Sequence, residues 1–363
     1  MLSVSGYRGI ELKHYEHEEQ KRASEDLKDY RVVRKGQLVV NTMWLNYAGL
    51  GVSDLEGHVS PAYRSYWISE RLDKKYIHYL MRSHVYVQGY TGQMQGIRPN
   101  SLQIKNVDFF KFPIVIPSIA EQKRIAEFLD RKCGEIDEAI SKKQRLIELL
   151  EEQKTILINQ AVTKGLDPNV PMKDSGIDWL GEIPEHWKVC SLSYLANLTA
   201  GGTPDRSKSE YWNGDIPWLK TGEINYNFIE ISEEYITEKG LKNSSAKIAP
   251  IGTILMAMYG QGITRGRVAI LGIKATFNQA TLAICVKEKI YNEFLYYYLI
   301  GAYQFIRDTG NETSQMNLSS GVIGKIKISF PEKKEQEEIS NFLDVKLVEF
   351  EDIKKEYQIK YRN

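Results

Sequence analysis

The sequence has few cysteines and no long hydrophobic run. Cys133, Cys190 and Cys285 are far apart and form no C-x-x-C pair, which argues against a disulfide framework and against a cysteine metal site. A membrane-spanning helix needs about 18 or more apolar residues, and the nearest candidate, residues 294–306, is shorter and rich in tyrosine. The first residues lack the basic-then-apolar pattern of a secretory signal. We therefore expect a cytoplasmic protein with no membrane partner.

The sequence also lacks the motifs of several enzyme classes. It has no G-x-x-x-x-G-K-[ST] phosphate loop, and it has no Pro-Pro pair, which the methyltransferase motif of Asn or Asp, two prolines and an aromatic residue requires. Glu11 and Lys13 have the E-x-K spacing of some nucleases, but this spacing is common by chance. His14 and His17 have a spacing that suits a metal, yet they lie in a charged stretch where we expect them to be solvated. The sequence thus predicts no catalytic residue, no metal site and no cofactor.

The charge balance is close to neutral. Lys and Arg number 48 against 47 Asp and Glu, which gives a net charge of +1. A nucleic-acid-binding protein need not be basic overall, because only the charge on its contacting face displaces counterions. With 42% apolar and 26% charged residues, the 363-residue chain has an ordinary globular composition and the length for two domains.

One stretch of the sequence occurs twice. "IAEQKRIAEFLD" covers residues 119–130 and "KKEQEEISNFLD" covers residues 333–344, and each follows a proline, Pro117 or Pro331. Matching positions lie 214 residues apart, which is far longer than the period of a solenoid repeat. The repeated object is therefore expected to be a domain followed by a helix.

Each copy of this stretch begins a pattern of apolar residues with alternating spacings of four and three. A period of 3.5 is typical of a coiled coil. The first pattern ends at Ala161, with Gly165 as a stop signal, so we expect helices over residues 119–165 and 332–363. We expect the two helices to pair within the chain, because a tethered partner has a high effective concentration, and two independent dimerisation helices are the alternative. The predicted coiled-coil positions are Ile125, Leu129, Ile136, Ile140, Ile147, Leu150, Leu343, Leu347 and Phe350.

Short strand-like runs separated by glycine turns precede each helix. Residues 166–331 contain "GTILMAMYG", "GRVAILGI" and "ATLAICV". Residues 1–118 repeat the later part of that region: "RVVRKGQLVVNTMW" parallels "AKIAPIGTILMAMY", with Gly36 opposite Gly252, and "KYIHYLMRS" parallels "NEFLYYYLIG". The sequence therefore predicts an α+β fold with two similar β-rich domains, residues 1–118 and 166–331. The first domain is expected to be incomplete at its start, and the second helix to be truncated.

These features resemble the specificity subunits of type I restriction–modification systems. The resemblance rests on the tryptophan-rich opening "DSGIDWLGEIPEHW", on "GGTPDRSKSEYWNGDIPWL", and on a proline followed by "EQKRIAEFLD" and a long helix ending "LINQAVTKGL". "FPEKKEQEEISNFLD" closes the second unit in the same order. The resemblance covers essentially the whole chain.

The resemblance implies a non-catalytic subunit with two target-recognition domains, each of which reads one half of a split sequence in double-stranded DNA. It also implies that the two long helices pair as an antiparallel coiled coil, set the distance between the half-sites and dock two methyltransferase (modification) subunits. Restriction subunits would join through that complex. The departures at both ends leave a second interpretation open, in which the chain is a truncated non-DNA scaffold or decoy that binds methyltransferase subunits without productive target recognition.

Polar residues on glycine-flanked loops are the candidates for contacting DNA. Direct readout needs side chains with donors and acceptors that reach base edges, and such loops approach the duplex without bulk. Because the loops differ between the domains while the scaffold is shared, we expect two different half-sites. The candidates in the second domain are Thr203, Arg206, Lys208, Lys220, Gln261, Thr264, Arg265, Arg267, Thr313 and Gln315. Those in the first domain are Asn41, Thr42, Tyr63, Arg64, Gln93 and Arg98.

Overall fold

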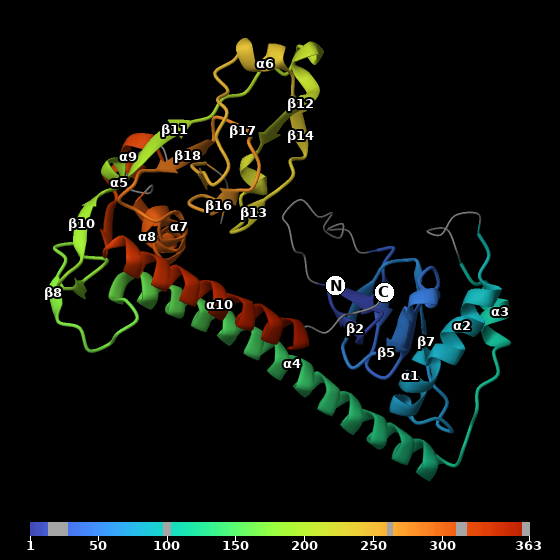
Figure 1. The fold of residues 1–363 in the computed structure, drawn as a ribbon. Coiled ribbons are helices and arrows are strands. Elements are labelled where there is room, and N and C mark those ends of the chain that lie inside the picture. The colour runs from blue at the N-terminus through green and yellow to red at the C-terminus, as the bar shows by residue number, and fades with distance from the viewer. Residues whose placement is uncertain (14–27, 97–102, 260–263, 310–317, 358–363) are drawn as a thin grey trace. The chain divides into compact units, whose positions relative to one another are not determined.

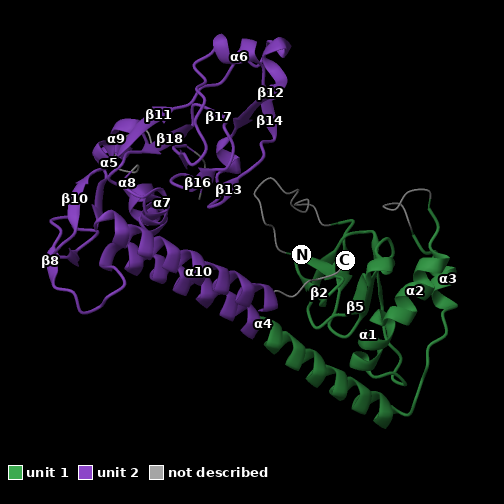
Figure 2. Ribbon diagram, viewed as in Figure 1, with its two compact units in different colours: residues 1–141 green, residues 142–363 purple. Residues whose placement is uncertain are grey.

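The chain folds into two compact units that both contain strands and helices. The computed structural model describes residues 1–13, 28–96, 103–259, 264–309 and 318–357 (Figure 1). Unit 1 comprises residues 1–141 and unit 2 residues 142–363 (Figure 2). The predicted α+β class is confirmed. Within the described ranges, no helix is both long and apolar enough to cross a lipid bilayer.

Unit 1 has its strands before its helices. Its elements are β1 (Leu2–Ser5), β2 (Gly9–Leu12), β3 (Arg31–Val33), β4 (Leu38–Asn41), η1 (Leu45–Tyr47), β5 (Leu50–Val52), β6 (Gly57–Val59), β7 (Tyr63–Tyr66), α1 (Lys74–Arg82), α2 (His84–Gln93), α3 (Asn106–Phe110) and the first part of α4 (Ile119–Lys164). The strands pair as β5-β4-β7, β1-β2 and β3-β6. Asp73 caps α1 by accepting hydrogen bonds from the backbone of Lys75 and Tyr76, and the buried face of α1 packs against this sheet.

Unit 2 has a larger set of strands. Its elements after α4 are β8 (Met172–Asp174), β9 (Glu182–Pro184), β10 (Lys188–Ser191), α5 (Leu192–Leu195), β11 (Ala196–Ala200), η3 (Ser209–Tyr211), β12 (Trp212–Leu219), η4 (Thr221–Glu223), β13 (Phe228–Ile229), β14 (Glu234–Ile236), α6 (Glu238–Lys242), β15 (Ile254–Ala257), β16 (Val268–Leu271), β17 (Thr276–Phe277), β18 (Thr281–Val286), α7 (Asn292–Gly301), α8 (Tyr303–Thr309), α9 (Ser320–Lys325), β19 (Lys327–Phe330) and α10 (Lys333–Tyr357). The sheets have the orders β11-β18-β15-β16-β13, β14-β12-β17, β10-β19 and β8-β9.

The repeat in the sequence corresponds to a repeated sheet with the same register. In unit 1, Leu38 of β4 lies opposite Val52 of β5 and Tyr66 of β7. The corresponding pairs in unit 2 are Ile254 of β15 with Ile270 of β16 and Ile284 of β18. The helices follow in the same order, so that α1, α2 and α3 of unit 1 correspond to α7, α8 and α9 of unit 2.

Two glycines produce the same turn before the central strand of each sheet. Gly36 precedes β4 with φ +85°, and Gly252 precedes β15 with φ +83°. An L-residue with a side chain rarely adopts this left-handed conformation, whereas glycine adopts it without steric cost. The predicted alignment of Gly36 with Gly252 is therefore confirmed by their matching geometry.

The long helices α4 and α10 pair antiparallel within unit 2, as predicted (Figure 1). Lys154 of α4 is bonded to Glu351 of α10 at 2.8 Å, and Glu151 of α4 to Lys354 of α10, so that rising numbers on one helix meet falling numbers on the other. Helix α4 ends where Gly165, with φ +78°, donates its N–H to Ala161. The described part of α10 stops at Tyr357, so the last residues of the predicted helix 332–363 lie outside the described residues.

The predicted coiled-coil positions differ in burial. Leu343 is fully buried, and Leu347 packs at the edge of the main core of unit 2. Ile147, Leu150 and Phe350 are half-buried on the paired helices. In unit 1, Ile125 packs against the core, and Leu129 and Ile140 are half-buried. Ile136 is 57% exposed, so no packed seam exists at that position in the described residues.

Candidate nucleic-acid interface

Three of the predicted DNA-contacting residues of unit 2 line one polar recess, which we call the Arg206 recess. Its volume is about 630 Å³. It lies where the loops after β11, β12 and β17 and the start of β14 meet. The lining residues are Thr203, Arg206, Trp218, Lys220, Thr221, Gly222, Glu223, Glu233, Asn278 and Gln279.

Two tryptophans and a carboxylate hold Arg206 in place. The guanidinium carbon lies 3.9 Å from the ring centroid of Trp212 and 4.8 Å from that of Trp218, and Nη1 donates to Glu234 at 2.5 Å. Trp218 is itself buried and donates its indole N–H to the carbonyl of Gly202 at 3.0 Å. Both rings orient the arginine, which presents a planar cation of the kind that forms paired hydrogen bonds with guanine or phosphate.

Lys220 is held in the same recess by carboxylates. Its Nζ lies 2.9 Å from Glu233 and 3.1 Å from Glu234, and these hydrogen bonds raise the pKa of Lys220. Burial favours a higher pKa for Glu234, but the hydrogen bonds from Arg206 and Lys220 outweigh it and lower that pKa. The recess therefore has balanced charge. It offers donors and acceptors to a base edge, whereas a phosphate would compete with Glu233 and Glu234 for the cations.

Glycine is required at the loop that carries Thr203. A Cβ on Gly201 would lie 2.2 Å from the carbonyl oxygen of Phe277 and 2.3 Å from that of Asn278, which no side chain tolerates. This close approach brings Thr203 to the turn after β17, where its hydroxyl donates to the side-chain oxygen of Gln279. The "GGTPDR" motif thus places Thr203 in the recess. Lys208, also predicted, lies outside it and donates to the hydroxyl of Tyr211 at 3.3 Å.

The glycine-rich loop before β16 behaves differently from the prediction. Arg265 is only 9% exposed and donates Nη2 to the carbonyl of Arg307 at 2.9 Å, so the structure gives it a packing role and does not support a direct DNA contact. Arg267 is half-buried and donates to the side chain of Asn225 at 2.7 Å. Thr264 is half-buried and, like Arg267, does not line the Arg206 recess.

Unit 1 has a polar recess of its own, which we call the Arg64 recess. Its volume is about 530 Å³, and it brings the predicted residues Thr42 and Arg64 together. The Nε2 atom of Gln103 donates to the Thr42 hydroxyl at 3.1 Å, and that hydroxyl donates to Ala62 at 3.2 Å. Thr42 is 3% exposed, so its hydroxyl is satisfied internally and positions Gln103. The lining residues are Thr42, Arg64, Gln95, Gly96, Gln103, Ile104, Lys105 and Asn106.

The other predicted residues of unit 1 do not line this recess. Asn41 is 9% exposed, and its side-chain oxygen accepts the backbone N–H of Met43 at 3.2 Å, so the structure gives it a turn-forming role and does not support a DNA contact. Tyr63 packs beside a small apolar cluster, and Gln93 is exposed at the end of α2. The predicted residues Gln261, Thr313, Gln315 and Arg98 lie outside the described residues, as do His14 and His17.

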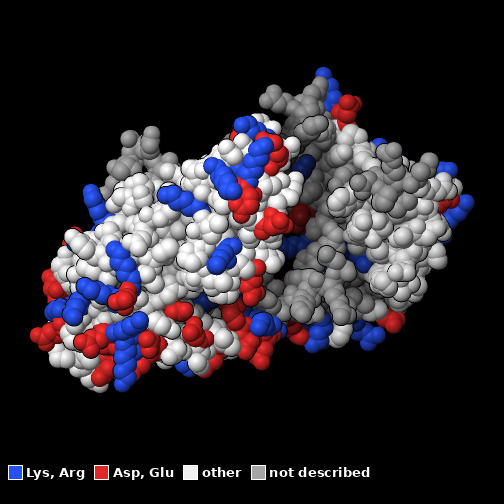
Figure 3. Space-filling view, turned by 45° about the horizontal axis from the view of Figure 1, so that its top comes forward, with Lys and Arg blue, Asp and Glu red and all other residues white. Residues whose placement is uncertain are grey.

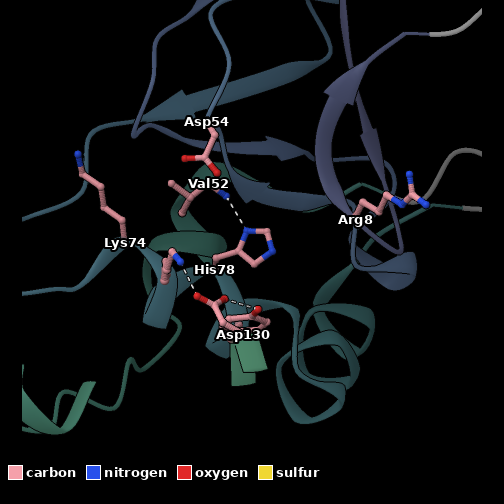
Figure 4. Close-up of a pocket in the computed structure, with 8 residues that line it drawn as sticks. Arg8, Val52, Asp54, Lys74, His78 and Asp130 are labelled. Carbon is pink, nitrogen blue, oxygen red and sulfur yellow. Dashed lines mark hydrogen bonds and ion pairs between the residues drawn. The ribbon is translucent and has the colours of Figure 1, made fainter. Parts of the chain in front are cut away.

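A third recess, of about 260 Å³, lies between α1, the strands of unit 1 and α4 (Figure 4). Nδ1 of His78 accepts the backbone N–H of Val52 at 3.2 Å, and burial lowers the pKa of His78 to about 4, so the ring is neutral at pH 7. The carboxylate of Asp130 accepts hydrogen bonds from Lys75 and, at 2.7 Å, from Tyr79. These contacts hold α1 against α4. We therefore assign the side chains of this recess to the packing of the two helices.

Charged side chains of both signs are interspersed on the face of the protein that Figure 3 shows. Lys and Arg side chains alternate with Asp and Glu over the described part of that face and do not merge into one basic area. This agrees with the near-neutral composition. On the described part of this face, an anionic partner would therefore meet no continuous basic area.

Sequence reasoning missed the amides of Asn278 and Gln279. They follow the short strand β17 and line the Arg206 recess beside Thr203 and Lys220. The polar dipeptide Asn278–Gln279 separates two apolar runs, "ATF" and "ATLAICV". Such a polar break between apolar runs indicates a turn, and this signal could have identified the two residues. Gln95 and Gln103, which flank the Arg64 recess, pair through their backbones at 3.0 Å.

Comparison with known proteins identifies the family. The family described as "Type I restriction modification DNA specificity domain" matches residues 184–360. The MjaIX type I restriction enzyme specificity subunit of Methanocaldococcus jannaschii is 32% identical over 169 residues, which cover 45% of this chain and 38% of that protein. The EcoR124I/EcoR124II specificity subunit of Escherichia coli is 29% identical over 45% of this chain and 41% of that protein. Residues 184–360 belong to this DNA specificity domain family, and the chain is similar to type I restriction specificity subunits.

The specificity-subunit fold extends over both units. The crystal structure of the HsdS subunit from Thermoanaerobacter tengcongensis matches with a TM-score of 0.55 and 16% identity, over 90% of this chain and 77% of that one. The chain spans about two fifths of the length of the two curated relatives. The residues that match the DNA specificity domain contain the whole Arg206 recess, whereas the Arg64 recess precedes the matched residues.

Proposed function

We propose that this specificity subunit reads a bipartite sequence in double-stranded DNA, with one half-site contacted through each unit. The observation that carries this proposal is the repeated scaffold with unlike recesses. The sheet register of β5-β4-β7 recurs in β16-β15-β18, and each unit adds a polar recess formed by different segments, residues 203–233 with Asn278 and Gln279 in unit 2, and Thr42, Arg64 and residues 95–106 in unit 1. A shared scaffold with different side chains is suited to reading two different sequences.

The Arg206 recess would supply direct readout in unit 2. Arg206 and the amides of Asn278 and Gln279 supply donors for base edges, although Asn278 Oδ1 already accepts from Ala280 and Thr281 and Gln279 Oε1 from Thr203, and Glu233 can accept from cytosine. Arg64, Lys105 and the amides of Gln95 and Gln103 would do so in unit 1. The chain would perform no chemistry itself.

The long helices would dock methyltransferase subunits, and restriction subunits would join through them. Support comes from apolar side chains that the helices expose in water. Val345 and Val348 of α10 are 60% and 62% exposed, and Ile156 of α4 is 48% exposed. Exposed apolar side chains on an otherwise polar helix favour a protein partner over solvent.

Selection of bound duplexes from a random pool would test this proposal. The chain is co-expressed with a methyltransferase subunit of its own system, and the complex is used for selection. Enrichment of two short motifs with a fixed gap is the expected result. Enrichment of one motif would limit readout to one unit, and recovery of the complex without any enrichment would favour the scaffold or decoy interpretation.

A further inference from the structure

The side-chain amide of Asn278 is used at one end only. Asn278 follows β17 and lines the Arg206 recess. Its Oδ1 accepts the backbone N–H of Ala280 at 3.2 Å and the hydroxyl of Thr281 at 2.9 Å. Because a backbone N–H can only donate, the amide cannot turn round without placing its amino group against that N–H. The amino group is therefore the end left for a ligand, and no residue in the described part of the chain accepts a hydrogen bond from it.

The backbone holds Asn278 in this position. Its N–H donates to the carbonyl of Leu219 at 3.0 Å, and its carbonyl accepts the N–H of Thr281 at 3.1 Å. Leu219 lies opposite Phe277 where β12 and β17 pair as parallel strands. The amino group is thus presented from a turn that is fixed on both sides, as a precise contact with a base requires.

The equivalent turn of unit 1 shows that the turn itself does not need an amino group. Tyr63 of β7 and Thr281 of β18 occupy the same register position, which makes Ser60 the counterpart of Asn278. The Oγ of Ser60 accepts the backbone N–H of Ala62 at 3.5 Å. A hydroxyl oxygen thus closes the turn in unit 1 in the place that Oδ1 takes in unit 2. The amino group of Asn278 is additional to the turn and is available for recognition.

The acceptors beside Asn278 are occupied within the recess. Both carboxylate oxygens of Glu223 accept backbone N–H groups, at 2.8 and 3.1 Å. Both oxygens of Glu234 bind the cations of the recess. The Oε1 atom of Gln279 accepts the hydroxyl of Thr203, so this neighbouring amide also presents its amino end. The side of the recess that Asn278 and Gln279 form therefore offers donors to a base.

A fixed donor distinguishes the two purines in the major groove of DNA. Guanine presents two adjacent acceptors there, N7 and O6, whereas adenine presents the acceptor N7 beside an amino group. An amide that is free at both ends suits adenine, but the amino group of Asn278 would meet the amino group of adenine as donor against donor. We propose that Asn278 makes unit 2 select guanine and reject adenine at one base pair of its half-site. This inference rests on the proposed function, because it names the base that the Arg206 recess contacts.

Substitutions that keep the turn and change the free end of the side chain test the proposal. Bound duplexes are selected from a random pool with the full chain and its methyltransferase subunit. The parent chain should prefer guanine over adenine about tenfold or more at one position. Asn278→Asp keeps the oxygen of the turn and replaces the amino group by an acceptor, so the preference should pass to a base that presents an amino group, adenine or cytosine. Asn278→Ser should keep the rest of the motif and lose the preference at that position. Asn197→Asp, which adds the same charge at an exposed position of β11 outside the recess, should select the parent motif.

A base analogue tests the same contact without relying on the folding of a variant. Replacing the selected guanine by 7-deazaguanine removes N7 and should weaken binding of the duplex to the parent chain several-fold, and unchanged binding would overturn the proposal. A motif with adenine at the position where Asn278→Ser relaxes the preference would overturn this inference and leave the proposed function intact, as would a motif that no Asn278 variant alters. Absence of any motif in the selection with the parent chain would overturn both.

Discussion

The side-chain amides of Gln122 and Gln336 make the same three hydrogen bonds in the two units. Each Nε2 donates to the carbonyl of the proline five residues earlier at 2.9 Å, and also to the carbonyl of a loop residue before α1 or α7, Arg71 at 3.1 Å or Lys289 at 3.2 Å. Each Oε1 accepts a backbone N–H, from Asp73 at 2.8 Å or Tyr291 at 2.6 Å. Both glutamines are 0% exposed.

Through these hydrogen bonds, the start of α4 is joined to the loop before α1 in unit 1, and the start of α10 to the loop before α7 in unit 2. Because every polar atom of the buried amide is used, truncation would leave buried backbone groups unsatisfied. We predict that Gln336→Ala lowers the free energy of unfolding of unit 2 by about 2–3 kcal/mol, and Gln122→Ala that of unit 1 by a similar amount. Denaturant unfolding would measure both. Gln153→Ala, at an exposed position of α4, is the matched control, and a loss as small as in this control would contradict the role of the glutamines.

The two ion pairs between α4 and α10 predict an antiparallel helix contact that charge reversal can probe. Lys154→Glu places a carboxylate beside Glu351, and we expect it to destabilise unit 2 by about 1 kcal/mol, since both partners are partly exposed and screened by solvent. The Lys154→Glu, Glu351→Lys double variant should recover most of that loss. A double variant as unstable as the sum of the single changes would show that the two side chains do not interact.

The same ion pairs predict the pH range over which they stabilise the pairing of α4 and α10. The hydrogen bond from Lys154 lowers the pKa of Glu351 below its ordinary value of 4.5, so its contribution is present above that value and is lost as the pH falls through the lowered pKa. The hydrogen bond to Glu151 raises the pKa of Lys354 above 10.5, so that contribution is lost as the pH rises through the raised pKa. The coupling energy of the Lys154–Glu351 cycle should therefore stay constant from above pH 4.5 through neutral pH. A coupling that changes between pH 6 and pH 9 would require other titrating groups.

Arg206 and Gln279 allow the contributions of a charged and an uncharged side chain to the proposed DNA recognition to be measured separately. We predict that Arg206→Ala weakens DNA binding at least tenfold and relaxes base preference, because the recess presents the guanidinium to a base edge. Gln279→Ala removes an uncharged amide, so it should relax base preference and leave the salt slope unchanged. Filter binding or anisotropy across a salt series would measure both. Lys334→Ala, on α10 with a 90% exposed side chain, is the control, and an equal effect of this control would refute a special role for the recess.

The exposed valines of α10 belong to the surface that we propose for docking of methyltransferase subunits. Val345→Glu together with Val348→Glu should reduce co-purification of the methyltransferase several-fold without lowering the unfolding temperature, because both side chains are already in solvent. Lys334→Glu on the same helix should not reduce it. Undiminished co-purification of the valine variant would place the docking surface elsewhere.

The sequence predicts the scaffold well and the recesses only in part, for physical reasons. The repeated register of Gln122 and Gln336 and the turns at Gly36 and Gly252 are local patterns, and the structure places each pair in equivalent positions. The burial of Arg265 depends on the carbonyl of Arg307, 42 residues later in the chain, and no local pattern specifies that contact. The Arg206 recess could not be predicted for the same reason. Its lining residues come from loops far apart in the sequence, and only the order of the strands in the sheets brings these loops together.

Selection from a random duplex pool with the Arg206→Ala variant, beside the parent chain, tests the central claim most directly. Arg206 lies in unit 2 and Arg64 in unit 1, so the two proposed half-sites are read by separate side chains. The account predicts that the variant loses base preference in one half-site and keeps the other half-site and the gap. Loss of preference in both half-sites, or in neither, would contradict it.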